Sequence, residues 1–546
     1  GQYPQALKYY EQALVIMKEV GNKAGEGTTL NNLGAVYNNL GQYPQALKYL
    51  EQALVIRKEV GDKALEGTTL NNLGAVYNSL GQYADAEKTL FPAIEIWESL
   101  RPGLTDASKI AIFETQTFSY RILQEALVAQ NKNNTALEIA ERGRARAFVE
   151  LLAQRQSSNP NNQLTIKPPT IQQIQQIAKT QNATLVQYST IENKVLYIWV
   201  VKPTGEIAFK QVDLKSLKTP LAELVNISRE SIGIRSRGGL IAVGSGENAQ
   251  ATVTARERLQ QLHQILIQPI AQFLPTDPNS KVIFVPQSSL FLVPFAALQD
   301  EQGKYLIEKH TILTAPAIQV LELTHQQRQR IGAIHKSPLQ GKDTLVMGNP
   351  TMPSIPDATG KLQQLASLPG AETEAKAIAQ LFNTQPIIGA SATKAAIIEK
   401  LKTARIAHLA THGLLDDFKL LGVPGAIALA PEGNDNGLLT SSEIFDLKLN
   451  AELVVLSACD TGRGDIKGDG VVGLSRSLIS AGVPSIIVSL WSVPDAPTAS
   501  LMTDFYRQIQ QNPNKAQALR QAMLTTMKQH PNPKNWAAFT LIGEAE

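Results

Sequence analysis

Apolar positions in the first hundred residues recur at helical spacing and repeat with a fixed phase. Residues 1–40 and 41–80 align without gaps and differ at five positions. The first copy contains two apolar sets at helical spacing, separated by a short break: Ala6, Leu7, Tyr10, Ala13 and Leu14, then Leu30, Leu33, Gly34 and Tyr37. Gly21 and Gly41 punctuate the turns. A pair of helices that recurs every 40 residues predicts an α-helical solenoid.

A third copy begins at Gly81 and loses the pattern after Trp97. The repeat resembles the tetratricopeptide repeat, in a long-period form of 40 residues. We expect the small residues Gly34 and Ala13 to let paired helices approach closely. The resemblance implies a concave surface that binds peptides or partner proteins across residues 1–101, with a spacer or cap as the plainer alternative. Because the first residue interrupts a repeat, we also expect further repeats upstream.

The pattern changes after the repeats. Residues 102–158 read as a helical connector, and residues 159–169, rich in Asn, Gln and Pro, read as a linker. Beyond them, short and continuously apolar runs alternate with helical stretches, which predicts an α/β domain with a mostly parallel sheet covered by helices on both faces. The predicted strands include Thr184–Tyr188, Val195–Val201, Val282–Pro286, Thr344–Gly348, Pro386–Ile388, Ile406–Thr411, Ala426–Ala430, Glu452–Ala458, Ser485–Leu490 and Ala537–Leu541.

Composition excludes several classes of function. There are 51 Lys and Arg against 48 Asp and Glu, so nothing favours binding to nucleic acid or to an anionic membrane surface. No apolar run is long enough to cross a bilayer, and the first residues lack the features of a secretory signal. The single cysteine, Cys459, excludes an intrachain disulfide and a thiolate zinc cluster. We therefore expect a cytoplasmic protein without membrane contact.

Two predicted strands end in residues that carry chemistry. His412 stands directly before Gly413, and Cys459 lies just ahead of a turn that contains Gly462. Carboxyl ends of parallel strands share one edge of a sheet, where reacting groups gather. An imidazole can take the proton of a thiol and return it to a departing amine. The backbone N–H groups of Gly413 and Cys459 are then the candidate oxyanion donors. The alternatives are a buried, inert thiol and a structural histidine.

The stretches His408–Gly413 and Leu456–Gly462, together with the segment Ser489–Asp495, resemble the CHAT family of caspase-related proteases. In that family the corresponding His and Cys form the catalytic dyad, which implies these roles for His412 and Cys459. The resemblance also implies a tandem layout, with an inactive caspase-like subdomain at residues 170–335 and an active one at 336–546. Members commonly carry tetratricopeptide repeats, act on protein substrates and need no cofactor.

The resemblance extends to substrate preference. Separase, which is similar in this region, holds arginine with an acidic residue downstream of the Leu-Trp strand, and Asp495 matches that position. This implies cleavage after Arg or Lys, with Ser489 and Trp491 in the same substrate-binding segment and Asp460 as a second candidate for the pocket. The edge of the strand Ser485–Trp491 is expected to pair with the extended substrate. Alternatively, Asp495 caps a helix that begins near Pro497.

Other classes of function remain open. His408, His412 and Cys459 could form a three-ligand metal site, but no H-E-x-x-H pattern is present, and we expect no metal. The match of Gly468–Gly473 to a dinucleotide motif lies too far from its strand. A repeat-bearing adaptor and a hydrolase of small amides or esters also fit. We favour a cysteine endopeptidase whose repeats recruit a substrate or an activating protein.

Overall fold

The computed structural model describes residues 2–101, 104, 106–156, 167–234, 249–335, 339–356, 361–414, 425–457, 465–467, 470–491 and 494–546. The chain forms two compact units. The first comprises residues 1–147 with 160–171, and the second comprises residues 148–159 with 172–546. No helix in the described ranges combines the length and the apolar character needed to span a bilayer.

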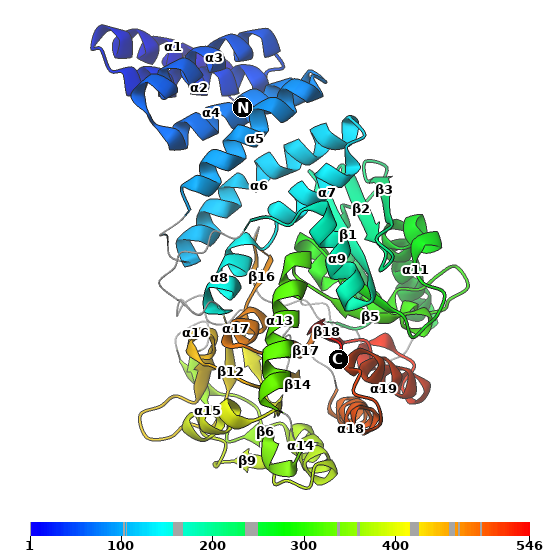
Figure 1. Cartoon of the computed structure of the whole chain (residues 1–546). Coiled ribbons are helices and arrows are strands. Elements are labelled where there is room, and N and C mark those ends of the chain that lie inside the picture. Colours follow the sequence, from blue (N-terminus) through cyan, green and yellow to red (C-terminus); the bar gives the residue numbers. More distant parts are fainter. Residues whose placement is uncertain are drawn as a thin grey trace. The chain divides into compact units, whose positions relative to one another are not determined.

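The first unit is a stack of helices (Figure 1). Its members are α1 (Tyr3–Glu19), α2 (Lys23–Asn39), α3 (Tyr43–Val60), α4 (Lys63–Ser79), α5 (Tyr83–Ser99), α6 (Asp106–Ala129) and α7 (Asn133–Arg142). Each helix packs against the next along the chain, and α2 also contacts α4, as α4 contacts α6. The predicted solenoid is thus confirmed, and it continues through α6 and α7, beyond the last recognisable copy of the repeat.

Close approach of paired helices explains the repeated glycines. A Cβ on Gly34 of α2 would overlap the side chain of Leu50 on α3, and Gly74 of α4 stands in the same relation to Leu90 on α5. Leu50 and Leu90 are fully buried. Any larger residue at either glycine would therefore push the helix pair apart. Between the helices, Gly61 ends α3 with a φ of 76°, a conformation that glycine adopts without strain.

The second unit is built on one eleven-stranded sheet with the order β3-β2-β1-β4-β5-β18-β17-β14-β10-β6-β9. The strands are β1 (Ala183–Ile191), β2 (Val195–Val201), β3 (Ile207–Asp213), β4 (Lys281–Val285), β5 (Thr311–Thr314), β6 (Thr344–Pro350), β9 (Ile387–Gly389), β10 (Ile406–Ala410), β14 (Leu453–Ser457), β17 (Ser485–Ser489) and β18 (Phe539–Gly543). All neighbours are parallel except β1–β2, β2–β3 and β17–β18. A mostly parallel sheet is what the continuous apolar runs predicted.

Both predicted halves of the domain contribute to this sheet. Residues 170–335 supply β1 to β5, and the C-terminal strand β18 joins the halves by pairing with β5. Three details differ from the prediction. Strands β3 and β5 were missed, and Ala426–Ala428 (β12) lies outside the main sheet. It pairs instead with β11 (Gly413–Leu414) and β13 (Leu438–Thr440) in a separate small sheet.

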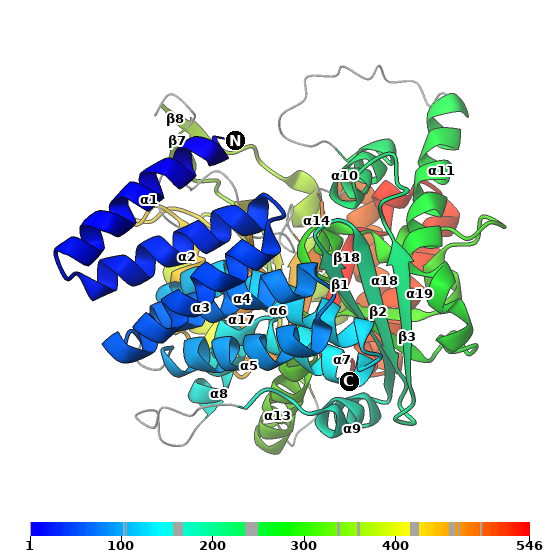
Figure 2. The ribbon, with the colours of Figure 1, turned by 90° about the horizontal axis from the view of Figure 1, so that it is seen from above.

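Two sets of helices pack on this sheet (Figures 1 and 2). In one set, α14 (Pro369–Leu381) contacts α18 (Asp495–Gln511), which contacts α19 (Lys515–Gln529). The other set joins α13 (Ile318–Ile334), α16 (Ser441–Asp446), α17 (Leu474–Ala481) and the C-terminal part of α8 (Arg146–Gln156). The other helices of the second unit are α9 (Ile171–Gln181), α10 (Leu221–Ser231), α11 (Ala249–Leu266), α12 (Leu306–Lys309) and α15 (Lys394–Thr403).

Candidate functional site

The candidate site begins where two neighbouring parallel strands, β10 and β14, end. Strand β10 runs parallel to β14, with Ala410 opposite Ser457, and both strands are buried along their whole length. His412 follows Ala410 by two positions, and Cys459 follows Ser457 by two. Cys459 and its neighbour Asp460 lie outside the described residues, so the site is described below from the histidine side.

The imidazole of His412 is held by a backbone carbonyl. Its Nε2 lies 2.8 Å from the carbonyl oxygen of Ala366, in the segment that leads from β8 (Leu362–Gln364) into α14. A carbonyl oxygen only accepts hydrogen bonds, so Nε2 must carry the proton. In the neutral ring, the second nitrogen, Nδ1, is then the proton acceptor. This contact therefore fixes the tautomer that a general base needs.

The main chain after His412 turns into the small sheet. The amide of Ala428 donates to the carbonyl oxygen of His412 over 3.0 Å, and the hydroxyl of Thr411 donates to the carbonyl oxygen of Ala428 over 2.8 Å. Gly413 is paired with Ile427. The bond from Ala428 to His412 makes this a non-hydrogen-bonded pair, so the N–H of Gly413 points away from β12. That N–H is thus not consumed by the small sheet.

Asn349 fixes the segment that bears Ala366. It lies near the carboxyl end of β6 with a φ of 45°, where the pairing of β6 with β9 shifts register. Its Oδ1 accepts from the amide of Leu368 at 2.8 Å and from the hydroxyl of Ser367 at 3.1 Å, and its Nδ2 donates to Glu372 at 3.1 Å. Hydrogen bonds from Lys376 and Asn349 lower the pKa of Glu372, which keeps this carboxylate ionised.

Asp495 meets the same segment at its other end. It is the first residue of α18, and its exposed side chain lies against Gly370, where a Cβ would overlap it. Within the described residues its carboxylate takes part in no hydrogen bond and no ion pair. Residues 366–370 thus contact both His412 and Asp495.

Ser489 and Trp491, also predicted to bind substrate, are each 1% exposed. The indole N–H of Trp491 donates to the carbonyl oxygen of Lys534 over 3.0 Å, and Ser489 pairs with Phe539 in β18. The expected pairing of an extended substrate with the edge of Ser485–Trp491 is wrong. Strand β17 lies between β14 and β18, and the amide of Leu490 already donates to Ala538, so this stretch has no free edge.

His408 has a structural environment. It is fully buried in β10, with Nδ1 at 3.1 Å from the hydroxyl of Tyr506 and Nε2 at 2.9 Å from Oε1 of Glu374, without an aligned hydrogen bond in the second contact. Both partners belong to helices, α18 and α14, rather than to the strand ends. In the described part of the chain, no cluster of three His, Cys, Asp or Glu side chains could hold a metal ion.

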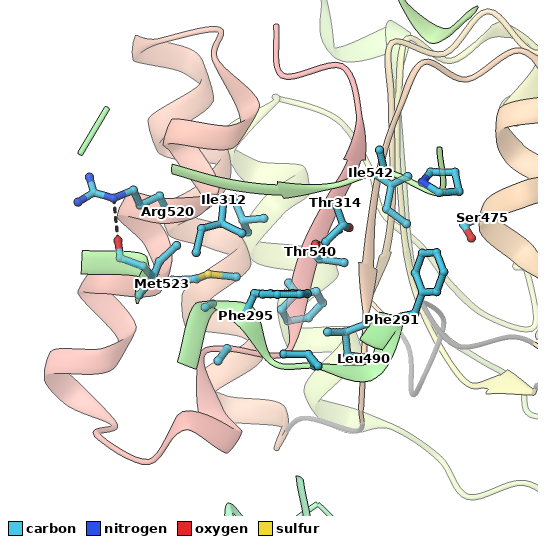
Figure 3. A pocket seen from close by; sticks show the side chains of 18 of the residues that line it. Phe291, Phe295, Ile312, Thr314, Ser475, Leu490, Arg520, Met523, Thr540 and Ile542 are labelled. Atoms are coloured by element: carbon cyan, nitrogen blue, oxygen red, sulfur yellow. Dashed lines mark hydrogen bonds between the residues drawn. The ribbon is translucent and has the colours of Figure 1, made fainter. Parts of the chain in front are cut away.

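The second unit also contains a separate cavity, and no histidine, cysteine or carboxylate is among its lining residues (Figure 3). It measures about 50 Å³, and apolar side chains such as Phe291, Phe295 and Ile542 line most of it. Arg520 at its edge donates to the carbonyl oxygens of Ile307 and Glu308, both at 2.8 Å. A space of this size holds at most a water molecule or two, so we regard it as a packing defect.

Sequence reasoning missed two residues of the site. The role of Ala366 lies in its carbonyl oxygen, which every residue type possesses, so no side-chain signal could reveal it. Asn349 carried a weak signal. Gly348-Asn349-Pro350 at the end of an apolar run is typical of a turn in which asparagine takes a left-handed conformation.

Comparison with known proteins agrees with the two-unit organisation. The tetratricopeptide repeat matches residues 1–59 and 25–99, and the CHAT domain matches residues 256–544. Tetratricopeptide repeat protein 28 of Mus musculus is 26% identical over 589 residues, which cover 83% of this chain. The human protein of that name is 26% identical over 581 residues and 83% of this chain. The chain spans 23% of the length of either relative.

The solved structures that resemble the chain include the separase–securin complex of Saccharomyces cerevisiae at 3.0 Å resolution. Its TM-score is 0.49 at 12% identity, and the match covers 99% of this chain and 46% of that one. The match to the CHAT domain extends over more than half of the sequence and includes His408–Gly413 and Leu456–Gly462, the stretches that suggested this family. The chain belongs to the CHAT-domain family and carries tetratricopeptide repeats ahead of that domain.

Proposed function

We propose that this chain is a cysteine endopeptidase in which Cys459 and His412 form the catalytic dyad. One observation carries the proposal. The carbonyl oxygen of Ala366 holds Nε2 of His412 at 2.8 Å, which leaves Nδ1 as the acceptor, at the end of a strand whose neighbour leads to Cys459. A base oriented by a third group beside a nucleophile is the general arrangement of covalent hydrolases.

The proposed reaction proceeds in two stages, acylation of Cys459 and hydrolysis of the resulting thioester. Nδ1 of His412 takes the proton of the Cys459 thiol as the sulfur attacks the peptide carbonyl, and the protonated imidazole then gives this proton to the departing amine as the C–N bond breaks. Water, deprotonated by the same imidazole, hydrolyses the thioester and restores the thiol. The N–H groups of Gly413 and Cys459 donate to the oxyanion in both stages.

The substrate carries an Arg or Lys before the scissile bond, and its charge pairs with the carboxylate of Asp495. The exposure of this carboxylate and its freedom from ion pairs in the described residues support the assignment. The repeats of residues 1–101 recruit the protein substrate or an activating protein, a role consistent with their stacked helix pairs. Without that partner the enzyme is latent, in the sense that it cleaves more slowly than with the partner bound. Equal turnover with and without candidate partners would contradict latency.

The dyad is tested by labelling with a peptidyl-arginine chloromethyl ketone. We expect one covalent adduct on Cys459 in the wild type, none in C459A, and slow labelling in H412A. The matched control is His335→Ala, because Nε2 of His335 also contacts a backbone carbonyl oxygen, that of Asn450, at 2.9 Å. It should label at the wild-type rate. A proteome-wide cleavage map of the wild type against C459A then identifies substrates.

The second candidate is a non-catalytic adaptor, and the names of the two curated relatives, which mention the repeats alone, favour it. It predicts no labelling of Cys459 above the rate of a free thiol and identical cleavage maps for wild type and C459A. If the chain instead hydrolyses small amides or esters, Cys459 should be labelled, but the cleavage maps of the wild type and C459A should be identical.

A further inference from the structure

A large cavity lies at the opposite end of strand β10 from His412. It measures about 890 Å³, within the range of sites that bind small molecules. Ile406 and Leu453, the first residues of β10 and β14, line it. His412 lies six positions after Ile406, about 20 Å of extended chain, so this cavity is distinct from the proposed dyad.

The walls combine apolar side chains with charged ones of both signs, and Glu452 and Glu546 are the acidic members. Ile331, Leu381, Phe382 and Ile509 supply apolar surface, from α13, the C-terminal end of α14 and α18. Arg328 of α13 and Lys515, the first residue of α19, supply positive charge. Figure 1 shows the relevant helices, α13, α18 and α19, around this part of the sheet.

Lys515 is the unusual member of this set. Its side chain lines the cavity and the residue is only 9% exposed, yet no carboxylate of the described residues forms an ion pair with its ammonium group. Burial, and after it the nearby charge of Arg328, lower the pKa of Lys515 to about 8 against partial compensation from Glu452, Glu544 and Glu546. The position at the N-terminus of a helix adds to the positive potential.

Each neighbouring carboxylate has a partner other than Lys515, and for Glu546 that partner includes Arg328 of the same cavity. Glu452 lies 2.7 Å from the guanidinium of Arg405. Glu544 accepts hydrogen bonds from Gln181 at 2.7 Å and from Thr324 at 3.2 Å, and it contacts His325. The exposed side chain of Glu546 lies 3.7 Å from both Arg328 and Lys281. A buried ammonium without a counter-ion is costly, which makes Lys515 a receptor for an anion.

Lys394 provides an internal comparison. It too is the first residue of a helix, α15, behind an N-cap side chain, and it is largely buried. Here the protein supplies the anions, because Asp435 and Glu443 lie 3.0 and 2.9 Å from the ammonium. Burial alone would lower the pKa of Lys394, but these two carboxylates outweigh it and raise the pKa. At Lys515 the corresponding place is open to the cavity.

We propose that this cavity binds an organic anion, whose carboxylate, sulfonate or phosphate group lies between Lys515 and Arg328 while its apolar body packs against Ile331, Phe382 and Ile509. The bound acidic group supplies the counter-ion that the chain provides to Lys394 but not to Lys515. The apolar walls favour an amphiphilic ligand over a free inorganic ion.

The probe is anilinonaphthalene sulfonate, followed by its fluorescence on titration into the whole chain. Phenylnaphthylamine, the same molecule without its sulfonate, serves as the uncharged comparison. We expect saturable binding of the sulfonate to the wild type, displacement by inorganic phosphate at high concentration, and affinity at least about tenfold weaker in Lys515→Met. Lys394→Met should bind the sulfonate as the wild type does, and the uncharged probe should not distinguish the variants.

Lys515→Met keeps the aliphatic stem and removes an unpaired buried charge, so we expect it to fold with an unchanged or higher melting temperature at pH 7. Arg328→Met is the second variant, with a half-exposed side chain whose loss is easily tolerated. Wild-type affinity in both variants, or no saturable binding to the wild type, overturns the proposal. Binding is measured without reference to cleavage, so the outcome is independent of the proposed protease activity.

Discussion

The hydroxyl group of Tyr506 lies 3.1 Å from Nδ1 of His408, and both side chains are fully buried. Glu374 completes the group at 2.9 Å from Nε2 of the same ring. Burial raises the pKa of Tyr506 well above its usual value, so the hydroxyl stays protonated. The group joins three elements. Strand β10 leads to His412, α14 follows the segment that contains Ala366, and α18 begins at Asp495. A buried polar contact thus ties together the three parts of the proposed site.

Replacing Tyr506 with phenylalanine should therefore affect both stability and cleavage. We expect a loss of about 1–3 kcal/mol in unfolding free energy, because Nδ1 of His408 loses its partner in the interior. Shifts of β10 relative to α14 would lengthen the contact of His412 with Ala366 and lower kcat more than they change KM. Thermal unfolding and steady-state cleavage of an arginyl peptide measure the two effects.

Tyr188→Phe is the matched control for Tyr506→Phe. Tyr188 is also fully buried, and its hydroxyl donates to the carbonyl oxygen of Leu266 over 3.0 Å, among strands remote from β10 in the sheet order. It should lose comparable stability and keep the kcat of the wild type. Equal kcat values in the two variants would show that the buried group has no positioning role.

Much of the second unit could be predicted because buried parallel strands have continuously apolar sequences. Val195–Val201 matches β2 residue for residue, and Ile406–Thr411 exceeds β10 by one residue. Strand β3 escaped because it is an edge strand with a half-exposed face, whose sequence IAFKQVD mixes polar and apolar residues. Ala426–Ala428 has the composition of a buried strand, but composition does not name the partner of a strand.

The candidate site could likewise be predicted only in part. His412 and Asp495 could be singled out as candidates from residue type and position, because the proposed chemistry belongs to their side chains. The error about the edge of Ser485–Trp491 arose because strand order depends on a distant segment. Strand β18, some fifty residues further on, returns antiparallel and takes that edge. No local pattern contains this information.

The contacts of Asn349 predict a positioning role. In Asn349→Ala, the amide of Leu368 and the hydroxyl of Ser367 lose their acceptor, and alanine must adopt a φ of 45°. We expect a loss of about 1–3 kcal/mol and a fall of roughly tenfold to a hundredfold in kcat, as Ala366 moves away from His412. Asn182→Ala is the control, with a φ of 42° and an exposed side chain. It should cost about 1 kcal/mol and leave kcat unchanged.

Gly370 tests the contact with Asp495. A methyl group at residue 370 would overlap the Asp495 side chain, so Gly370→Ala should displace the carboxylate and reduce kcat/KM for arginyl substrates severalfold. Gly332 of α13 has open space around its Cβ position. Gly332→Ala should therefore stabilise the chain by up to about 1 kcal/mol and leave cleavage alone. Unaltered kcat/KM in Gly370→Ala would separate Asp495 from substrate binding.

The charge of Asp495 predicts the residue preference. Asp495→Asn should lower kcat/KM for peptides with Arg before the scissile bond by about tenfold to a hundredfold, with little change for neutral residues there. Asp495→Lys should favour an acidic residue instead. Asp504→Asn changes another acidic residue of α18, which pairs with Arg507 at 3.0 Å, and should leave the preference intact. A preference for acidic residues in the wild type would discard the idea.

Lys515 gives the stability of the second unit a distinct dependence on pH. Its pKa is about 8 in the folded chain and 10.5 in the unfolded one, so between these values the unfolded state binds the additional proton. The unfolding free energy should therefore rise with pH across this window, by about 3 kcal/mol in all, relative to Lys515→Met. The groups that act on this ammonium are Arg328 of α13, Glu452 before β14, and Glu544 and Glu546 after β18.

Denaturant unfolding of the second unit at pH 7 to 10.5 measures this difference. Lys394→Met serves as the control, since the pKa of Lys394 is raised and its contribution is fully present below pH 10.5. The difference between the wild type and this variant should stay constant through the window. An anion bound between Arg328 and Lys515 would oppose loss of the proton, because the charged ammonium becomes the favoured form. Saturating anilinonaphthalene sulfonate should therefore shift the rise in stability to higher pH in the wild type and do nothing in Lys515→Met. A wild-type profile parallel to that of Lys515→Met would mean that the ammonium already has a counter-ion.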